Sequence, residues 1–600
     1  MLDPKDLVIA PGLYTIQTDR GAKGRWKDGD KVRFRHGEPE KIGGWLKSGI
    51  LTFLGKCRAL IDWQSLSFEK LIGLGTHLKL YVWNGGTYYD ITPLRASGTL
   101  GVDPLTTTNL SAVVNVADTA HGNTAGDYVH LSGATAVGGI TVSGEYTVTS
   151  VVDADNYTIT HSSAATSSAT GGGAAVAYEY EIHIGAEDSI YGLGWGSGAW
   201  SASTWGTPRT ISNFLTAARI WSMDNWGEDM VACPRDGAIY VWDTSVGTST
   251  RAAVISGAPA SAKLVMVSPE NRHLIAFGAH NGSYLDPLLI RWSTSEDYTD
   301  FVPDNSDSAG QKRLDSGNEI LTAIKGRKEM QVFTDADLWA MAFIGPPNTF
   351  SFDRIGQNGG IRGPNAAIEV HGVTYWMGEK DFFYYDGSIK VLPCDVHPTV
   401  FGKAADGYSG SNLVQRNKTY SFYNRAFGEV GWMYCSEAET EVDRYVAFNV
   451  EEKTWTFGTL ARTAFVGDSD IFLVPYATGT NGYIYDHETG DDDDTAAMTA
   501  SLESGDVEIG EGGMLMIVTA IIPDFKRLTG NVSMRLQAKK YPHSSSYESD
   551  SGNLTVNSAT KFVNPRVKGR QVTLSLSSSA VGDSWRMGTN RVGLKPYGKK

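Results

Sequence analysis

The pattern of apolar and polar positions along the chain predicts many short strands rather than helices. A short apolar run at 71–75 leads into Leu80–Trp83, a turn at Asn84–Gly86, and a second strand at Thr87–Ile91. Asn-Gly and Asp-Gly pairs tolerate the positive φ angles that tight hairpins need. The same order of strand, turn and aromatic-rich strand recurs at Asp229–Asp243, Val373–Gly387 and Tyr445–Asp486. Units of this size with little identity predict the degenerate blades of a β-propeller, and a series of unrelated meanders is the alternative.

Residues 98–182 differ in composition from the rest of the chain. They are rich in Thr, Val, Ala and Gly, and apolar and polar residues alternate clearly at Gly144–Val152 and Asn156–Thr160. Strict alternation is typical of a strand with one buried face. Insertions whose ends lie close together are well tolerated, so this segment predicts a small β-sandwich or barrel inserted into the larger domain.

The acidic run Asp491–Asp494 indicates a boundary, because alternation resumes beyond it at Val532–Gln537 and Gln571–Ser577. These runs predict a C-terminal β-sandwich-like domain. The expected organisation is therefore an N-terminal platform with the first propeller-like strands (1–97), the inserted domain (98–182), a propeller-like domain (183–495) and the C-terminal domain (496–600).

Composition supports an all-β fold, since the 600 residues include 68 Gly, 16 Trp and 27 Tyr. Glycine supplies turns, and aromatic residues favour strands. The formal net charge of −15 argues against a protein that grips nucleic acid over its whole surface. That charge suits a conduit through which DNA slides, and it equally suits an ordinary soluble protein. The last forty residues are the exception: Asp583 is their single acidic residue, beside nine Lys or Arg. They predict either a solvated surface or a contact with an acidic partner or nucleic acid.

Targeting and redox signals point to a protein that folds in a reducing cytoplasm. The four cysteines lie far apart, and the N-terminus lacks the basic and apolar regions of a signal peptide. The most apolar run, Met514–Ile522, is too short to cross a bilayer. We therefore expect no disulfide scaffold and no membrane insertion.

Tests for chemistry are mostly negative. Cys394 and His397 have the spacing of two zinc ligands, but no second pair follows, so a buried thiol and a turn histidine are the better interpretation. The Gly/Trp patch at 192–206 lacks the Lys-Ser/Thr and the βαβ unit of a phosphate loop, and packing explains it better. No Gly-x-Ser-x-Gly elbow is found between a strand and a helix. We expect no catalytic residues, no cofactor, no metal and no enzymatic activity.

Four blocks of sequence resemble the tail nozzle proteins of short-tailed bacteriophages (podoviruses), a family related to packaged-DNA stabilisation and tubular tail proteins. The blocks cover both ends and the middle of the chain, and they comprise Pro11–Tyr14 with Gly24–Phe34 and Pro39–Trp45, then Ile290–Tyr298, then Phe333–Val396, and finally Gly569–Val572 with Trp585–Arg591. The resemblance implies a structural virion protein of the tail, assembled in the host cytoplasm. It also implies a propeller-containing homohexameric ring whose channel would retain packaged DNA and conduct it during ejection.

The resemblance also implies the partners. These are the tail adaptor ring, double-stranded DNA in the lumen and, as further candidates, tail fibres or tailspikes. The candidate adaptor or subunit contacts are Arg25, Trp26, Arg33, Arg35, Trp45, Arg586 and Arg591. The inserted segment departs from the family pattern, so nozzle tip, fibre docking and decoration all stay open as its role.

Two other classes of function stay open. One is a receptor- or glycan-binding virion protein, with the insertion or the Gly/Trp patch as the carbohydrate platform. The other is a propeller glycosidase or lyase of a depolymerising tailspike, although no repetitive parallel β-helix is visible. Glycan binding or turnover of capsule polysaccharide would separate either class from a nozzle.

Overall fold

A computed structural model describes residues 4–19, 21–191, 215–304, 307–357, 359–509, 514–544 and 546–598. The chain divides into two compact units. Unit 1 comprises Met1–Thr52, Asp188–Leu215 and Leu314–Lys600, and unit 2 comprises Phe53–Glu187 and Thr216–Arg313. Nearly all regular structure is β; the helical segments of the described residues are short, namely α1 (His397–Phe401), η2 (Thr244–Val246), η3 (Ala404–Asp406) and η4 (Arg416–Lys418). The predicted all-β, propeller-like fold class is confirmed.

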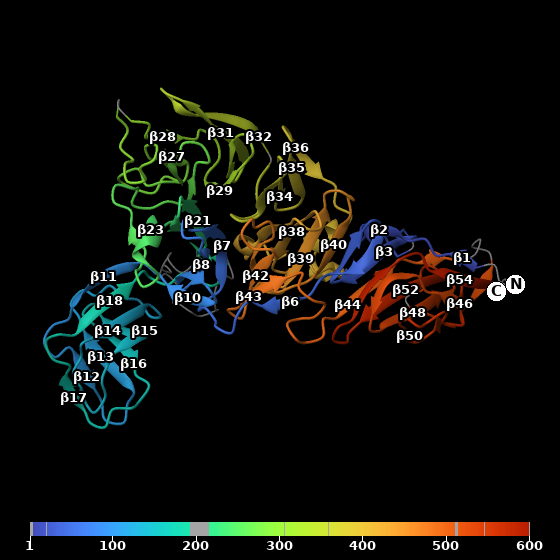
Figure 1. The fold of residues 1–600 in the computed structure, drawn as a ribbon, viewed down its shortest axis with the longest axis horizontal. Coiled ribbons are helices and arrows are strands. Elements are labelled where there is room, and N and C mark those ends of the chain that lie inside the picture. The colour runs from blue at the N-terminus through green and yellow to red at the C-terminus, as the bar shows by residue number, and fades with distance from the viewer. Residues whose placement is uncertain are drawn as a thin grey trace, which may run out of the picture. The chain divides into compact units, whose positions relative to one another are not determined.

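Unit 2 contains three four-stranded antiparallel meanders among its described residues (Figure 1). Each runs in chain order from one edge strand to the other, as expected when consecutive strands are joined by tight turns. The strands are β7 (Cys57–Gln64), β8 (Lys70–Thr76), β9 (Leu80–Asn84) and β10 (Thr87–Asp90); β21 (Trp221–Trp226), β22 (Asp229–Pro234), β23 (Tyr240–Trp242) and β24 (Ala253–Val254); β25 (Leu264–Val267), β26 (Leu274–Phe277), β27 (Leu289–Trp292) and β28 (Gly310–Arg313).

Aromatic side chains fill the space between the first two meanders. Trp63 and Trp242 meet edge to face with ring centroids 6.3 Å apart. Trp221 is 2% exposed, and its indole N–H donates to Thr76 O at 2.8 Å. The ring of Trp221 lies directly against Gly75, where an added Cβ would be 2.5 Å from Trp221 Cγ. Glycine is therefore required at residue 75 by the close approach of a neighbouring ring.

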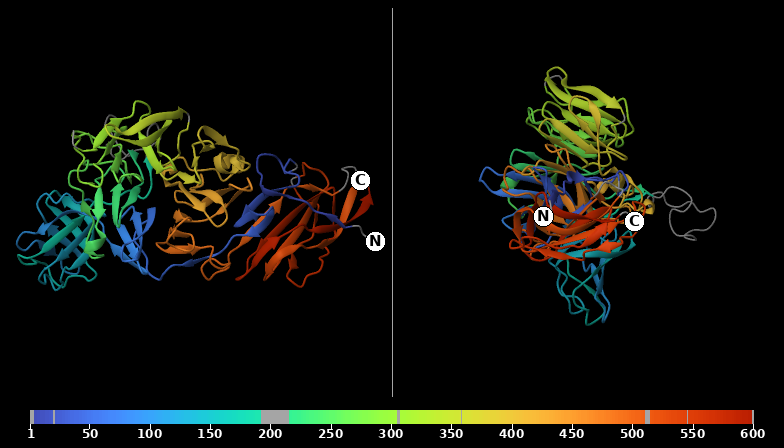
Figure 2. Two further views of the ribbon diagram at one scale, coloured as in Figure 1. Left: turned by 45° about the horizontal axis from the view of Figure 1, so that its top comes forward. Right: turned by 90° about the vertical axis from the view of Figure 1, so that its right-hand side faces the viewer.

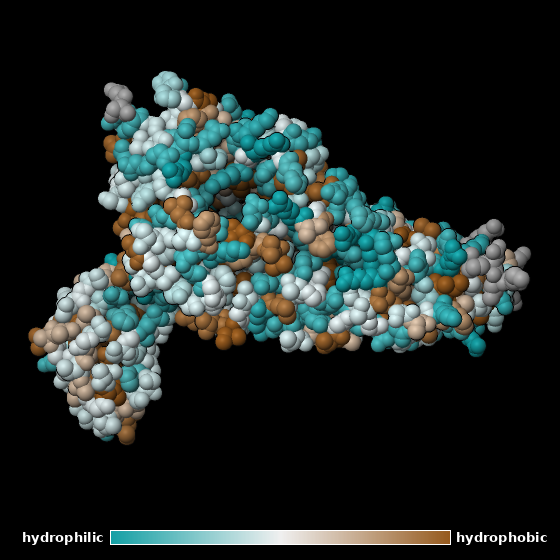
Figure 3. Space-filling model, viewed as in Figure 1, coloured by the Kyte–Doolittle hydropathy of each residue, from teal (hydrophilic) through white to brown (hydrophobic). Residues whose placement is uncertain are grey.

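The insertion forms an eight-stranded sheet in the order β11-β18-β14-β15-β16-β13-β12-β17. The long β15 pairs with β14 near its start and with β16 near its end, so the sheet folds over a core of its own. Figure 3 shows its surface mostly in pale colours, as its Thr, Ala and Gly content predicts. The strands are β11 (Leu94–Thr99), β12 (Leu105–Thr107), β13 (Val113–Ala117), β14 (Tyr128–Ser132), β15 (Gly144–Asp153), β16 (Asn156–Thr160), β17 (Ala169–Gly171) and β18 (Ala177–Glu181).

Unit 1 contains four further sheets of the same kind among its described residues. The last of them takes its edge strand, β6 (Trp45–Lys47), from near the N-terminus, where it pairs with β43. The other strands are β29 (Ile320–Lys325), β30 (Met330–Thr334), β31 (Asp337–Gly345) and β32 (Thr349–Gln357); β33 (Ala367–Val370), β34 (Val373–Met377), β35 (Phe382–Tyr385) and β36 (Ile389–Leu392); β37 (Tyr420–Asn424), β38 (Glu429–Tyr434), β39 (Arg444–Asn449) and β40 (Trp455–Thr459); β41 (Arg462–Val466), β42 (Tyr476–Gly479) and β43 (Ile484–His487).

The rest of unit 1 is a β-sandwich built from both ends of the chain. Its sheets have the orders β2-β3-β44-β52-β48-β49, β1-β54-β46-β51 and β4-β5-β53-β47, and β45 and β50 add to the first. The strands are β1 (Pro4–Asp6), β2 (Ala10–Leu13), β3 (Arg25–Asp30), β4 (Val32–Arg35), β5 (Glu38–Lys41), β44 (Ala500–Ser504), β45 (Val507–Glu508), β46 (Leu515–Ile522), β47 (Phe525–Thr529), β48 (Val532–Lys539), β49 (Ser549–Asp550), β50 (Leu554–Val556), β51 (Val567–Gly569), β52 (Gln571–Ser578), β53 (Ser584–Met587) and β54 (Arg591–Gly598).

In both figures the blue N-terminal strands of this sandwich run beside the red C-terminal strands (Figures 1 and 2). Unit 1 thus combines residues from the expected segments 1–97, 183–495 and 496–600, while β11 begins at Leu94 and β18 ends at Glu181. A short pair, β19 (Ile190–Tyr191) and β20 (Leu215–Thr216), flanks the Gly/Trp patch, which lies outside the described residues. No helix in the described ranges is long and apolar enough to cross a membrane.

Candidate functional site

Three of the residues expected to make adaptor or subunit contacts meet on the sheet β4-β5-β53-β47. Arg586, on β53, forms an ion pair with Glu38 at 2.7 Å and donates from Nη2 to the carbonyl oxygen of Arg35 at 2.9 Å. Arg35 is exposed, whereas Arg33 on the same strand is only 4% exposed. The two ends of the chain are therefore joined here by strand pairing and by ionic contacts.

Arg33 is held by contacts within its own unit. Its Nε lies 3.3 Å from Glu429, its Nη atoms bind Glu488, and its guanidinium stacks 3.6 Å above the ring of Phe427. Burial by itself would lower the pKa of Arg33, but the two carboxylates outweigh it and the pKa is raised. Burial raises the pKa of Glu429 to about 7 in spite of Arg33. This is an internal ion network in which removal of one partner leaves a buried charge.

The two tryptophans of the predicted set are also internal. Trp26 is 1% exposed and packs in the main hydrophobic core of unit 1. Trp45 is 2% exposed and donates its indole N–H to Asp493. The guanidinium of Arg462 lies 4.9 Å from the centroid of the Trp45 ring. The acidic run is thus partly used to fix β6, with Asp494 also paired to Lys47 at 2.9 Å.

The remaining two predicted residues keep exposed side chains. Arg591 pairs with Asp6 at 3.2 Å, and more than half of each side chain is exposed. Arg25 lies 3.5 Å from Asp395 and 4.9 Å from the ring centroid of Tyr14. The structure therefore does not gather all seven predicted residues at one place.

Asp395 belongs to an aromatic pocket of about 340 Å³ in unit 1. The rings of Tyr375 and Tyr384 are inclined by 27° to one another with centroids 6.3 Å apart, and Lys453 and Trp455 contribute to the lining. Burial raises the pKa of the Asp395 carboxyl, against the effect of Arg25. Apolar ring faces with a few polar groups are typical of small-molecule pockets, and this volume is near their lower limit.

The zinc pair considered from sequence is used otherwise. Burial raises the pKa of the Cys394 thiol, which disfavours the thiolate that a metal needs. His397 Nε2 lies 2.8 Å from Lys380 O and 3.2 Å from Asp381 Oδ1. Cys394 is only partly buried, and His397 is not a turn residue but the first residue of α1.

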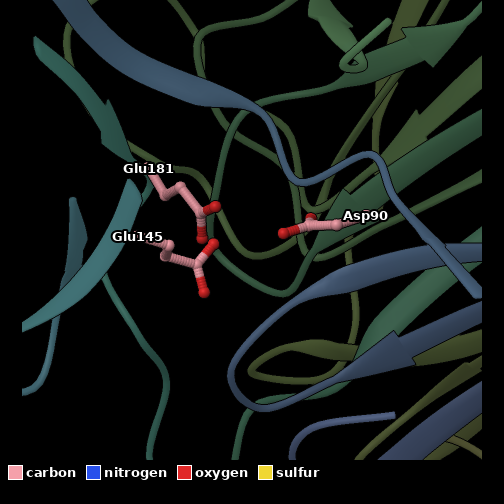
Figure 4. Close-up of side chains that lie close together, drawn as sticks. All are labelled: Asp90, Glu145 and Glu181. Atoms are coloured by element: carbon pink, nitrogen blue, oxygen red, sulfur yellow. The ribbon is translucent and has the colours of Figure 1, made fainter. Parts of the chain in front are cut away.

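Within the described residues, one group of acidic side chains has the spacing of a metal site. Carboxylate oxygens of Asp90, Glu145 and Glu181 lie within 4.8 Å of one another. Figure 4 shows the three side chains pointing toward a common centre, Asp90 from the meander and the two glutamates from the inserted sheet. Asp90 ends β10, Glu145 lies at the start of β15, and Glu181 ends β18. The group therefore lies where the inserted sheet meets the first meander of unit 2.

An ammonium group occupies the centre of this group. Lys79 Nζ lies 2.6 Å from Asp90, 2.6 Å from Glu145 and 3.0 Å from Glu181. Arg251 adds a second cation, 3.0 Å from Asp90 and 2.7 Å from Glu181. A divalent ion would have to displace Lys79, whose side chain is only 2% exposed. The residues present fit a buried ion network better than a metal site.

The protonation of this network follows from its charges, three carboxylates against two cations. Burial would lower the pKa of Lys79 and raise that of Asp90, but the mutual attraction raises the first and lowers the second. Burial, with the nearby charge of Asp90, raises the pKa of Glu181 to about 7. Glu181 Oε1 accepts from both cations, whereas its buried Oε2 has no hydrogen-bond partner. Glu181 therefore holds a proton more tightly than an ordinary glutamate does.

Sequence reasoning did not find this network. Lys79, Asp90, Glu145, Glu181 and Arg251 lie in four separate stretches of the chain, and none has a spacing that indicates chemistry. Glu145 and Glu181 stand out only as charges in an inserted segment with few of them. Their meeting depends on how the inserted sheet is attached to the meanders.

Comparisons with known proteins add little. No protein-family model and no curated protein matches the sequence. Among solved structures, the endosialidase of phage phi92 is 10% identical over 72% of this chain, with a TM-score of 0.18, and the chain spans 64% of it. A fungal alcohol oxidase of the AA5 family, in complex with copper, is 9% identical over 84% of this chain and 99% of its own, with a TM-score of 0.31. Similarities this weak assign no function.

Proposed function

We propose that this chain is a structural subunit of the tail nozzle of a short-tailed bacteriophage. In this proposal a homohexameric ring retains packaged DNA in its channel and conducts it during ejection. The ring attaches to the tail adaptor, and tail fibres or tailspikes are further candidate neighbours. The proposal starts from the sequence resemblance, and it assigns the chain no catalytic step.

The observation that carries the proposal is the pairing of the two terminal blocks of the resemblance. The first block supplies β3, β4 and β5, and the last supplies β53; Glu40 on β5 is paired with Arg586 on β53. Trp26, Trp45 and Trp585 from these blocks are all at most 2% exposed. Buried residues of this kind maintain the packing of a framework, whereas residues of a reactive site are exposed to a substrate. A structural role accounts for this placement more simply than catalysis does.

The negative net charge of the chain supports its proposed role as a channel for DNA. The chain carries a net charge of −15, and a ring of such chains repels DNA phosphates on average. Repulsion limits adhesion of DNA to the wall, so that DNA can slide. Reversing acidic residues that line the channel should slow DNA ejection, and unchanged ejection would count against this part of the proposal.

A second candidate function is glycan binding, and the aromatic pocket favours it. The apolar faces of a sugar ring pack on rings such as Tyr375 and Tyr384, and Asp395 and Lys453 offer polar contacts to hydroxyl groups. Binding of the purified chain to a glycan array that is lost in Tyr384→Ala would support this function. Turnover of capsule polysaccharide would instead support the depolymerase.

Immunogold electron microscopy of intact virus particles tests the proposal, with antibodies raised against the purified chain. Label on the tail axis below the head, with six-fold density in end-on class averages, is the expected result. Label on peripheral fibres or spikes would overturn the nozzle and favour the glycan-binding protein. Particles that bind no antibody, while denatured particles show the chain on a blot, would place it away from the exposed tail and also contradict the proposal.

A further inference from the structure

The most apolar stretch of the sequence forms a strand whose outer face is only partly covered. β46 (Leu515–Ile522) reads as a nearly continuous apolar run, a pattern typical of strands buried on both faces. Val518 and Ile521 point inward and are at most 1% exposed. Ile517, Ala520 and Ile522 lie on the other face; Ile517 and Ala520 are partly buried, and Ile522 is 43% exposed. The sequence of this strand therefore anticipates a covering layer that its own unit supplies only in part.

Positive charges flank this apolar row. Ile517 is paired with Lys595 on β54 and with Lys568 on β51. Ile522 is paired with Arg591, whose charge is already matched by Asp6 at 3.2 Å. Directly paired residues project to the same face of a sheet, so the cations stand on either side of the apolar row. Among the described residues, neither lysine forms an ion pair; Lys568 Nζ lies 5.1 Å from the exposed ring of Tyr597. We call the outer surface formed by Ile517, Ala520, Ile522, Lys568, Lys595 and Arg591 the β46 face.

We propose that the β46 face binds an acidic surface on a second copy of this chain. An apolar centre with a charged rim is the usual anatomy of a protein–protein interface. The partner must be acidic, and the chain itself is acidic outside its last forty residues, where nine Lys or Arg stand beside one Asp. When two different surfaces of identical subunits bind each other, the subunits form a ring if the rotation that relates neighbouring subunits adds up to a full turn. The inference thus rests on the ring of the proposed function and names one of its interfaces.

Nucleic acid fits this surface less well. Protein–DNA interfaces are strongly polar and positively charged, because they face a row of phosphates. Here the middle strand would set Ile517, Ala520 and Ile522 against those phosphates, with cations only at the sides. Apolar side chains in the centre gain more from a protein surface that excludes water.

Self-association of the purified full chain tests the interface. Sedimentation velocity over a concentration series compares the wild type with Lys568→Glu/Lys595→Glu and with Ile522→Asp. We expect the dimerisation constant to weaken by about tenfold or more in each variant, and the wild-type association to weaken with added salt. Lys526→Glu/Arg527→Glu is the matched control, because both residues are exposed on β47 of another sheet in the same sandwich. Unchanged near-UV circular dichroism shows that each variant is folded.

A cross-linking experiment locates the contact. Ile522 is replaced by the photo-cross-linker p-benzoylphenylalanine, and light and ¹⁵N-labelled chains are mixed before irradiation. Mixed light–heavy cross-links to peptides rich in Asp and Glu are the expected result. Cross-links confined to one copy, association unchanged in both variants, or a wild type that stays monomeric up to on the order of 100 µM would overturn the inference.

Two further outcomes are informative. Binding of a DNA duplex that is lost in Lys568→Glu/Lys595→Glu, without self-association, would assign the face to nucleic acid and overturn the inference. The location of the chain in the virus is tested separately by immunogold labelling. If the label lies on the tail axis but substitutions in the β46 face leave self-association unchanged, only this interface is refuted. If the substitutions weaken self-association but the label lies elsewhere on the particle, only the nozzle is refuted.

Discussion

Replacing Lys79 with methionine removes the cation at the centre of the ion network in unit 2 and keeps most of the side-chain volume. Asp90, Glu145 and Glu181 then face one another with Arg251 as the remaining counter-charge. At 2.6 Å and an effective dielectric constant of roughly 20, one lysine–carboxylate contact is worth about 6 kcal/mol of gross Coulomb energy. Desolvation offsets most of this energy, and removing one partner of a buried pair costs about 3–5 kcal/mol net.

This cost should appear as easier opening of the joint between the inserted sheet and the first meander. A loss of about 3 kcal/mol corresponds to a roughly hundredfold faster amide hydrogen exchange where opening is limiting. Exchange measured by mass spectrometry should therefore accelerate in β10, β15 and β18 at pH 8. It should accelerate less at pH 5, where protonation of Glu181 relieves the repulsion.

Lys312→Met is the matched control, since Lys312 is exposed on β28 of the same unit. We expect it to change stability by less than about 0.5 kcal/mol, as for other exposed positions. If exchange in β10, β15 and β18 is the same in Lys79→Met as in this control at pH 8, the network does not hold the joint.

Three further predictions concern other contacts. Because Glu181 binds a proton more tightly in the folded state, unit 2 should lose up to about 3 kcal/mol of stability as pH rises from about 4.5 to 7, and Glu181→Gln should remove this dependence in hydrogen exchange of β18. Arg33→Met leaves Glu429 buried without its cation, so it should destabilise β4 and β38 by about 3 kcal/mol at pH 8 in urea-dependent exchange, and less at pH 5. Gly75→Ala should cost about 1–3 kcal/mol, because the new methyl group displaces the Trp221 ring, and should red-shift tryptophan fluorescence.

Each of these has a result that would contradict it. A wild-type exchange profile in β18 that is flat between pH 4.5 and 7 would show that Glu181 is not the titrating group. Arg35→Met is the control for Arg33→Met, since Arg35 is exposed on the same strand, and equal effects would refute the ion network. Gly75→Ala with wild-type fluorescence and exchange would show that the Trp221 ring moves aside without cost.

Much of the local structure could be predicted from sequence. Alternating apolar positions closed by Asn-Gly and Asp-Gly turns, as at Leu80–Ile91, determine hairpins because neighbouring strands pair across a few residues. The inserted β-domain was predicted because its composition changes abruptly from that of the flanking meanders. The candidate site was not predictable in the same way, since Lys79 and Glu181 are more than a hundred residues apart and neither lies in a motif.

By itself, then, the sequence determined that the fold is all-β and where several of its hairpins lie, as at Leu80–Ile91. The tertiary structure decided which distant strands pair: β6 completes the sheet of β41–β43, β5 pairs with β53, and β1 pairs with β54. Periodicity reports only that a strand has a buried face, whereas its partner depends on register, shape and charge contributed by remote parts of the chain. For the same reason the sequence of β46 is typical of a strand buried on both faces, and only the folded unit reveals that one of its faces is incompletely covered.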